Sequence, residues 1–396
     1  MGEQSDNLKL HVECSEGALS SGGSGQIFNG EFNPAMLTTA REARHFTQAD
    51  LADAMDVSQP LINQWEALTV PGLPSKRPNE EQIIKLAERL RFHPSLFYVS
   101  RPTRMTNPSE FLHRALKRAK PRDLKAAHAR CSIIDLQVDR LLAHCPPPDD
   151  HIPDIDADNH AGDVEKIAAM TRARMGVPPG PVGNLVDTIE ACGGIVIDRD
   201  LEIDDLDALC RWVPGLPKLF FLNGKRPGDR MRLTLAHELG HTVMHFNRDV
   251  EQSLAETQAQ RFAAAFLLPA NEIRTDLGMK VDIPKLMALK RKWRVSMQAI
   301  AYRAHQIGSI TDTRYRSLFQ QMSREGWRKN EPTSVAVRPE SPRAFKRLLR
   351  AHIAEGYTHV QLAEMLFVTD EKLKQMLIDA ASPDWEDAGV RMRIAR

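Results

Sequence analysis

The sequence predicts a mainly α-helical, multidomain protein with a small α+β part. Apolar residues recur at helical spacing through most of the chain, whereas two short runs, 194–197 and 219–222, have the composition of strands. The chain has 396 residues, and at roughly 100–200 residues per domain this length predicts two to four domains. Segments rich in glycine, serine or proline interrupt the helical pattern and mark candidate boundaries.

Two of these interruptions and one basic stretch indicate domain boundaries. Glycine and serine dominate residues 20–25, which favours a flexible tail. Residues 101–130 carry nine basic against two acidic side chains, and prolines exclude a helix interior over 146–153. The predicted segments are a tail (1–33), a helical bundle (34–100), a basic helical connector with a Pro-rich linker (101–153), a mixed segment with a small sheet (154–313) and a helical C-terminal segment (314–396).

Composition excludes several classes of protein. The formal net charge of +1 excludes a globally basic DNA-coating protein and a highly charged disordered chain. Apolar runs long enough for a transmembrane helix are missing, and the first twenty residues lack the pattern of a secretory signal. The five cysteines are an odd number without CxxC spacing, which argues against a disulfide framework or a cysteine-only zinc site. We therefore expect a cytoplasmic protein without a membrane partner.

Residues 46–66 have the pattern of a helix-turn-helix. Thr47 is predicted to cap a first helix, Val57 to fill the turn, and Ser58 to cap a second helix that tolerates Pro60 in its first turn. The predicted buried side chains of the two helices are Leu51, Ala52, Met55, Leu61, Ile62 and Trp65.

The segment from Pro34 to Tyr98 resembles the XRE/Cro-type helix-turn-helix family. The resemblance implies that double-stranded operator DNA is a partner. It also makes a homodimer a candidate assembly, because such proteins commonly bind palindromic sites. A helical bundle with no DNA partner is the alternative. By analogy, Gln48 contacts a phosphate, and the residues offered to the major groove are Ser58, Gln59, Asn63 and Gln64.

The same pattern returns near the C-terminus. Residues 46–58 match residues 357–369 at a constant offset, which predicts a second helix-turn-helix-like segment. Its outward face carries adjacent acids, Asp370 and Glu371, which phosphates repel. Packing or dimerisation is therefore at least as good an interpretation of this copy as DNA contact.

Two histidines four residues apart, His237 and His241, enclose Glu238. On a helix such residues are offset by about 40° and lie about 6 Å apart along the axis, so both imidazoles can reach one metal ion. Glu238 can then accept a proton from a water held at that metal. The pattern predicts a zinc site, and a buried helix with hydrogen-bonded histidines is the alternative.

A catalytic zinc takes three protein ligands, so a third is needed. The extended pattern of the metzincins fails, because Met244 and Asn247 stand where that pattern needs Gly and His. In the helix predicted over about 251–268, Glu251 and Glu256 both fall near the apolar stripe, and periodicity does not choose between them. Glu251 also has an ordinary role near the helix start, where it stabilises the dipole.

The segments 237–241 (HELGH) and 256–269 (ETQAQRFAAAFLLP) together resemble the ImmA/IrrE family of zinc metallopeptidases. Three further segments, 207–212, 227–232 and 295–303, match the same family, and the last resembles its C-terminal helix-turn-helix. The resemblance spans about 160–313 and implies a zincin-like, gluzincin-like domain that binds Zn²⁺. It implies His237, His241 and Glu256 as the zinc ligands and Glu238 as the catalytic base.

Three further features keep two interpretations each. His245 lies one turn beyond His241 and can orient a ligand or touch substrate, or simply pack at the helix end. The strand predicted over 218–222 can pair with an extended substrate or be purely structural. Tyr302 can stabilise an oxyanion, although core packing is the better interpretation.

A DNA reader and a peptidase motif on one chain predict a regulatory zinc metalloendopeptidase of narrow specificity. The resemblance implies that it cleaves a partner repressor encoded nearby, or its own DNA-binding domain, in a mobile-element or stress response. The alternative is a transcriptional regulator or antitoxin-like protein whose peptidase fold is a sensor or dimerisation module. The intact Glu238 argues against that alternative, because a purely structural zinc site does not require a base.

Overall fold

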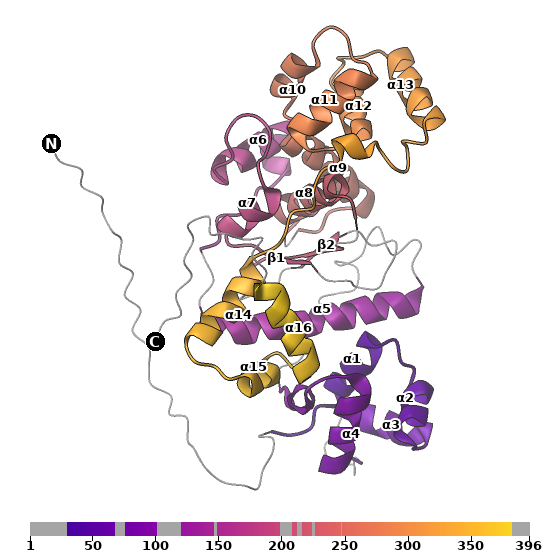
Figure 1. The fold of residues 1–396 in the computed structure, drawn as a ribbon, viewed down its shortest axis with the longest axis vertical. Helices are drawn as coiled ribbons and strands as arrows, with labels where there is room; N and C mark the ends of the chain where they lie inside the picture. The colour runs from indigo at the N-terminus through magenta and orange to yellow at the C-terminus, as the bar shows by residue number, and fades with distance from the viewer. Residues whose placement is uncertain are drawn as a thin grey trace, which may run out of the picture. The chain divides into compact units, whose positions relative to one another are not determined.

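The computed structural model describes residues 30–67, 76–100, 120–145, 149–198, 208–211, 216–223, 226–246 and 248–381 (Figure 1). Most of the predicted tail, the basic stretch before Lys120 and the prolines at 146–148 lie outside the described residues. The chain divides into two compact units. Unit 1 comprises residues up to Thr103, Cys131–Pro147 and Lys346–Arg396; unit 2 comprises Arg104–Arg130 and Pro148–Phe345.

The N-terminal part of unit 1 is a helical bundle that contains the predicted helix-turn-helix. Thr47 caps the first of its two helices through a capping box with Asp50, as predicted. Ser58 occupies the N-cap position of the second helix, but its side chain makes no cap hydrogen bond. Leu61 is half-buried, whereas Ile62 and Trp65 are fully buried. The elements are α1 (Pro34–Ala43), α2 (Gln48–Met55), α3 (Gln59–Glu66), α4 (Glu80–Leu90) and the short 3-10 helix η1 (Pro94–Tyr98).

The second helix-turn-helix-like segment also lies in unit 1, and its turn is a packing element. The carbonyl of Glu364 accepts from Ser95 Oγ at 2.9 Å, and that of Leu366 accepts from Gln137 Nε2 at 2.7 Å. The carbonyl of Phe367 accepts from the His93 amide at 3.0 Å. These contacts add hydrogen-bond partners to carbonyls at the end of the first helix of this segment and in the turn that follows it. The elements involved are α5 (Pro121–Leu142), α14 (Ala344–Ala354), α15 (His359–Met365) and α16 (Asp370–Ala381).

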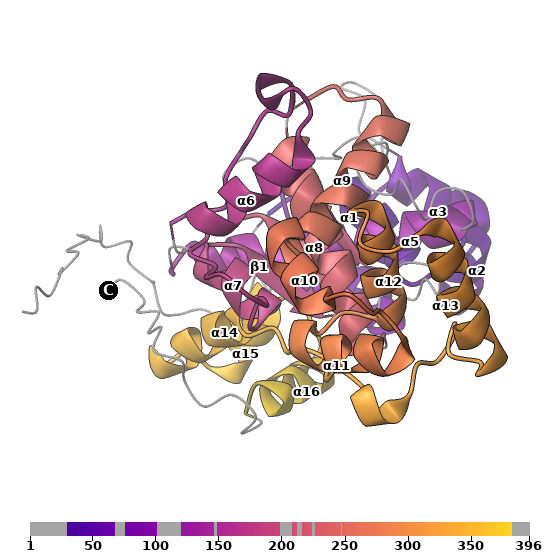
Figure 2. The same ribbon diagram turned by 90° about the horizontal axis from the view of Figure 1, so that it is seen from above.

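Unit 2 is built around two helices, α8 (Gly228–Met244) and α9 (Gln252–Leu267). Gly240 lets them approach closely, because a Cβ at this position would meet the Phe262 ring at 2.9 Å. Helix α9 packs on its other side against α6 (Val164–Arg174) (Figure 2). The remaining elements are η4 (Asp158–His160), α7 (Leu185–Ala191), α10 (Ala270–Leu277), α11 (Ile283–Trp293), α12 (Met297–Gln306), α13 (Asp312–Arg324) and η5 (Thr333–Val335).

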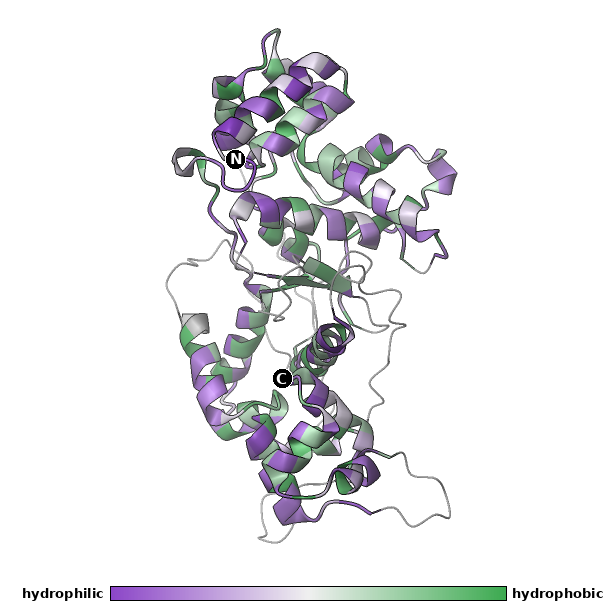
Figure 3. Ribbon diagram, turned by 90° about the vertical axis from the view of Figure 1, so that its right-hand side faces the viewer, coloured by the Kyte–Doolittle hydropathy of each residue, from purple (hydrophilic) through white to green (hydrophobic). Residues whose placement is uncertain are grey.

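A three-stranded sheet packs against α8 and is mostly apolar, with Asp198 and Arg211 as its charged residues (Figure 3). Its order is β1-β3-β2, with β3 parallel to β1 and antiparallel to β2. Of the two interpretations of residues 218–222, the structural one is supported. Because β3 is paired on both sides, both rows of its backbone groups are already used, and an extended substrate cannot add to it. The strands are β1 (Ile195–Asp198), β2 (Ala208–Arg211) and β3 (Leu219–Leu222).

The segment after α13 ties several parts of unit 2 together. Glu331 accepts from the amide of Met297 at the start of α12 and from the buried Lys290 ammonium. Glu340 accepts from the amides that begin α7 and pairs with Arg232 of α8, whose side chain is 1% exposed. Residues as far as Phe345 therefore pack in the same unit as α8.

The turns of the two repeated helix-turn-helix segments share a left-handed residue, and the described residues contain a third turn of this kind. Asp56, Arg294 and Phe367 each adopt a left-handed conformation, with φ of 58°, 56° and 56°. Each is followed by valine and then by serine or threonine, directly before a helix. The additional copy joins α11 to α12, at the segment expected from the ImmA/IrrE resemblance. Among the described residues, no helix combines the length and apolar character needed to cross a membrane.

Candidate metal centre and DNA-reading face

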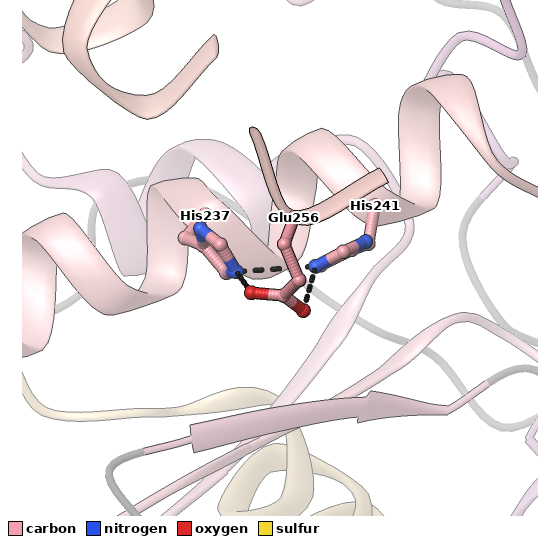
Figure 4. Close-up of side chains that lie close together, drawn as sticks. All are labelled: His237, His241 and Glu256. Carbon is pink, nitrogen blue, oxygen red and sulfur yellow. Dashed lines mark hydrogen bonds and ion pairs between the residues drawn. The ribbon is translucent and has the colours of Figure 1, made fainter. Parts of the chain in front are cut away.

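The three predicted metal ligands meet at one point between α8 and α9 (Figure 4). His237 and His241 project from the same side of α8, and their Nε2 atoms lie 3.1 Å apart. Glu256 reaches them from α9, with its carboxylate oxygens 3.4 Å from His237 Nε2 and 3.3 Å from His241 Nε2. Within the described part of the chain, no other set of three or more His, Cys, Asp or Glu side chains lies close enough together to share a metal ion.

The spacing of these donor atoms suits zinc. Zinc binds imidazole nitrogen and carboxylate oxygen at about 2.0–2.2 Å, so adjacent ligands of a tetrahedral site lie about 3.3–3.5 Å apart. The three observed separations, 3.1, 3.4 and 3.3 Å, are close to this value. Calcium and magnesium prefer all-oxygen ligand sets, whereas two imidazoles and one carboxylate are a ligand set of catalytic zinc. The residues present therefore fit a zinc ion with a fourth position open.

The two candidate third ligands have different roles in the structure. Glu251 is exposed and caps α9, accepting from the amides of Ser253 and Leu254. Glu256 faces the histidines. Although partial burial raises the pKa of Glu256, the two imidazoles lower it more, so the pKa lies well below its usual range. The structure therefore places an ionised carboxylate at the centre and leaves Glu251 with the helix-end role.

Glu238, the predicted base, lies on α8 beside the edge strand β2. Its Oε2 accepts a hydrogen bond from the amide of Cys210 at 3.0 Å. Burial, and after it the nearby Glu238 carboxylate, holds the pKa of the Cys210 thiol well above its usual value, so the sulfur remains a neutral thiol. The strand thus fixes one oxygen of Glu238 with a backbone donor.

His245 is hydrogen-bonded through both ring nitrogens. Its Nδ1 lies 3.0 Å from His241 Nδ1, and its Nε2 lies 2.9 Å from Gln258 Oε1. Burial lowers the pKa of His245 to about 4, so the ring is neutral at physiological pH. The structure thus brings His245 against the candidate ligand His241.

Sequence reasoning missed Cys210 and Gln258. The only signal for Gln258 is its position three residues after Ala255 and four before Phe262, which places a polar side chain on the buried stripe of α9. The sequence indicates residues 208–211 as part of a family match, but not as a strand.

Tyr302 is 45% exposed, so the expectation that it packs in the core is wrong: its ring lies on the outer side of α12.

The predicted DNA-contacting residues form one polar surface on α2 and α3. Gln48 donates to Glu66 Oε2 at 2.8 Å, and Gln59 donates to Gln48 Oε1 at 3.0 Å. Glu66 is in turn held by Arg41. Asn63 accepts a longer hydrogen bond from Gln48. The side chains that remain exposed on this surface are Ser58, Gln59, Asn63 and Gln64.

Comparison with known protein families matches two segments of the chain. Residues 37–97 match the family described as helix-turn-helix, and residues 191–305 match the peptidase family described as the IrrE N-terminal-like domain. A search of curated proteins finds no match. Both predicted resemblances and the predicted mainly helical fold class are confirmed. The chain therefore combines an XRE-type helix-turn-helix DNA-binding domain with an IrrE N-terminal-like metallopeptidase-like domain.

Proposed function

We propose that this protein is a DNA-bound regulatory zinc metallopeptidase of the cytoplasm. Its substrate is a repressor-type protein, either a helix-turn-helix partner encoded nearby or its own DNA-binding domain. The observation that carries the proposal is the convergence of His237, His241 and Glu256 at zinc-ligand distances, with Glu238 next to them on α8. Cleavage of such a substrate would change transcription in a mobile-element or stress response.

His237, His241 and Glu256 would hold the zinc ion. Bound zinc would supply Lewis-acid polarisation of the peptide carbonyl and activation of a water molecule. The pair of imidazoles contributes neutral donors, and Glu256 contributes one negative charge, so the site retains a net positive charge once loaded. Such a site favours the negative charge that develops on the carbonyl oxygen during hydrolysis.

Glu238 would transfer a proton from the attacking water to the leaving amine. Its carboxylate accepts a proton from the attacking water and later delivers it to the leaving amine. The Cys210 amide holds one oxygen of Glu238, which limits its rotation and leaves the other oxygen for the water. Peptide hydrolysis therefore requires no acid–base residue beyond Glu238.

The helix-turn-helix domain would hold the peptidase at specific DNA sites. Its exposed amides at Gln59, Asn63 and Gln64 are side chains of the type that hydrogen-bond to base edges in the major groove. A peptidase tethered at an operator meets a repressor bound to the same region at high effective concentration. Weak intrinsic affinity for the substrate is then sufficient, which limits damage to other proteins.

The test compares wild type with Glu238→Gln. Both proteins are purified with zinc, and each is incubated with the helix-turn-helix proteins encoded beside its gene, with and without the neighbouring intergenic DNA. Defined cleavage products by mass spectrometry with wild type alone, and equal zinc in both proteins, are the expected result. Identical behaviour of wild type and Glu238→Gln across these substrates would reject proteolysis and favour a regulator whose peptidase fold is a binding module.

A further inference from the structure

Two buried side chains connect α9 back to a candidate metal ligand on α8. We propose that Gln258 and His245 are positioning residues that hold the proton of His241 on Nδ1 and keep its Nε2 lone pair free for zinc. The inference rests on the proposed metal site and goes beyond it, because it assigns a function to two residues that do not touch the ion. We call this hydrogen-bonded series, Gln258–His245–His241, the histidine relay.

The relay is continuous in its hydrogen bonds. Gln258 Oε1 lies 2.9 Å from His245 Nε2, and His245 Nδ1 lies 3.0 Å from His241 Nδ1. At the far side of the His241 ring, Nε2 lies 3.3 Å from Glu256 Oε1. Gln258 and Glu256 both belong to α9, so this helix supplies one candidate ligand directly and positions another through His245.

The direction of the relay follows from the chemistry of its groups. A neutral imidazole has one N–H donor and one lone-pair nitrogen, and an amide oxygen only accepts. Because Gln258 presents oxygen, His245 must carry its proton on Nε2, which leaves Nδ1 as an acceptor. His241 must then donate from Nδ1, and its Nε2 is unprotonated. With the amide reversed, each proton would move to the opposite nitrogen, and a protonated Nε2 does not bind a metal.

Burial makes this arrangement effective. His245 and Gln258 are each 9% exposed, so water competes little for their hydrogen bonds. The other histidine provides an internal comparison. His237 Nδ1 is buried and has no hydrogen-bond partner among the described residues. The two histidine ligands therefore differ, and a change in the relay should affect His241 without affecting His237.

The first test measures zinc affinity of the full chain by competition with a chromophoric chelator at pH 8. Gln258→Leu has a side chain of similar size without an acceptor, and we expect it to lower zinc affinity by about 10–100-fold, as loss of an outer hydrogen-bond partner of a ligand typically does. Gln258→Glu retains an acceptor, and we expect it to bind zinc at least as tightly as wild type. Equal affinity of wild type and Gln258→Leu would overturn the proposal.

A double-mutant cycle separates relay from packing. His245→Phe retains a ring in the same space but removes both nitrogens, so it should lower zinc affinity by a similar factor. Once the relay is broken in this way, adding Gln258→Leu should cause little further loss. If the two losses simply multiply, the residues act independently through packing, and the relay is rejected.

The second test observes the proton itself. Histidine-selective ¹⁵N NMR of the zinc-free chain distinguishes Nδ1–H from Nε2–H tautomers. We expect His241 as Nδ1–H in wild type and Gln258→Glu, a mixture in Gln258→Leu, and no change at His237. A His241 tautomer that is insensitive to Gln258→Leu would overturn the relay. Failure of wild type to bind zinc would instead contradict the proposed metal site, while the tautomer would still decide whether the relay exists.

Discussion

The amide of Cys210 donates a hydrogen bond of 3.0 Å to Glu238 Oε2. The contact joins the edge strand of the sheet to the helix that carries both histidines. It gives the carboxylate a fixed orientation through a backbone amide. Only a substitution by proline removes that N–H donor, because every other residue retains it.

Cys210→Pro should lower kcat for peptide hydrolysis by about 10–100-fold, because a hydrogen bond to a charged group is worth about 1.5–3 kcal/mol. Bound zinc should be unchanged, since Cys210 is not among the candidate ligands. Cys210→Ala retains the amide and is the matched control. Equal loss of activity in both variants would show that the thiol or local packing matters, rather than the backbone donor.

Glu256→Gln should affect zinc binding, whereas Glu251→Gln should affect only stability. Glu256→Gln removes the charged ligand and should lower zinc affinity by more than tenfold, measured by equilibrium dialysis and elemental analysis. Glu251→Gln should leave zinc affinity unchanged and slightly lower the free energy of unfolding, because it weakens a helix cap. A large loss of zinc from Glu251→Gln would reverse the assignment of the third ligand.

Gln59→Ala and Asn63→Ala should each weaken binding to the operator by about 1–3 kcal/mol, the usual value of a side chain that reads a base. The check is a fluorescence-anisotropy titration at fixed salt, with the intergenic DNA next to the gene and a scrambled duplex. Gln375→Ala on α16, at the position that matches Gln64, is a control in the second helix-turn-helix-like segment and should not change affinity. Loss of affinity only in that control would move the DNA-reading surface to α16.

Burial of His352 should make the protein sensitive to acid. Burial lowers the pKa of His352 below its usual 6.5, and its Nε2 has no hydrogen-bond partner among the described residues. Its contribution to stability is complete above pH 6.5 and is lost as the pH falls toward the folded-state pKa, because the unfolded state then binds a proton that the folded state does not.

His352→Phe should remove up to about 1.4 kcal/mol per pH unit from the pH dependence of the unfolding free energy below pH 6.5. Urea unfolding of both proteins at pH 7.5, 6.0 and 5.0 measures the difference. Phenylalanine suits the site, because the ring packs against Tyr357. Parallel pH profiles of the two proteins would mean that the pKa of His352 is the same in the folded and unfolded states.

Glu340→Ala should destabilise the protein by about 3 kcal/mol or more. Arg232 is buried in α8, and removal of its carboxylate partner leaves a charge without compensation. Thermal or urea unfolding provides the measurement, with the exposed Glu325→Ala as the control. A cost below about 1 kcal/mol would show that the carbonyls of Val182 and Gly183, which also accept from Arg232, are sufficient for the guanidinium.

Much of the fold and of the metal centre was readable from local patterns. The HELGH helix and the helix-turn-helix are defined by residues close in sequence, whose spacing on a helix fixes which side chains share a face. Glu256 was ambiguous with Glu251 because both lie near one stripe, and the resemblance to a family, rather than periodicity, favoured Glu256.

The features that sequence reasoning missed depend on distant segments. The family resemblance indicated a helix-turn-helix at 295–303, but Arg294 differs in type from Asp56 and Phe367, so residue identity did not reveal that all three adopt the same left-handed conformation. The pairing of β3 on both sides depends on β2, whose four residues, Ala208–Arg211, lack a periodic signal. Gln258 is visible as a polar residue on a buried stripe, but only the packing of α9 on α8 shows that its partner is His245.

X-ray absorption at the zinc edge, measured on the wild-type chain, would show directly whether His237, His241 and Glu256 bind the metal. We predict one zinc per chain, bound by two imidazole nitrogens and carboxylate oxygen at about 2.0–2.2 Å, with a further light atom in the fourth position. Loss of the imidazole signal in His237→Ala together with His241→Ala would confirm the assignment. A zinc bound through sulfur at about 2.3 Å, or no zinc in protein purified without chelators, would contradict it.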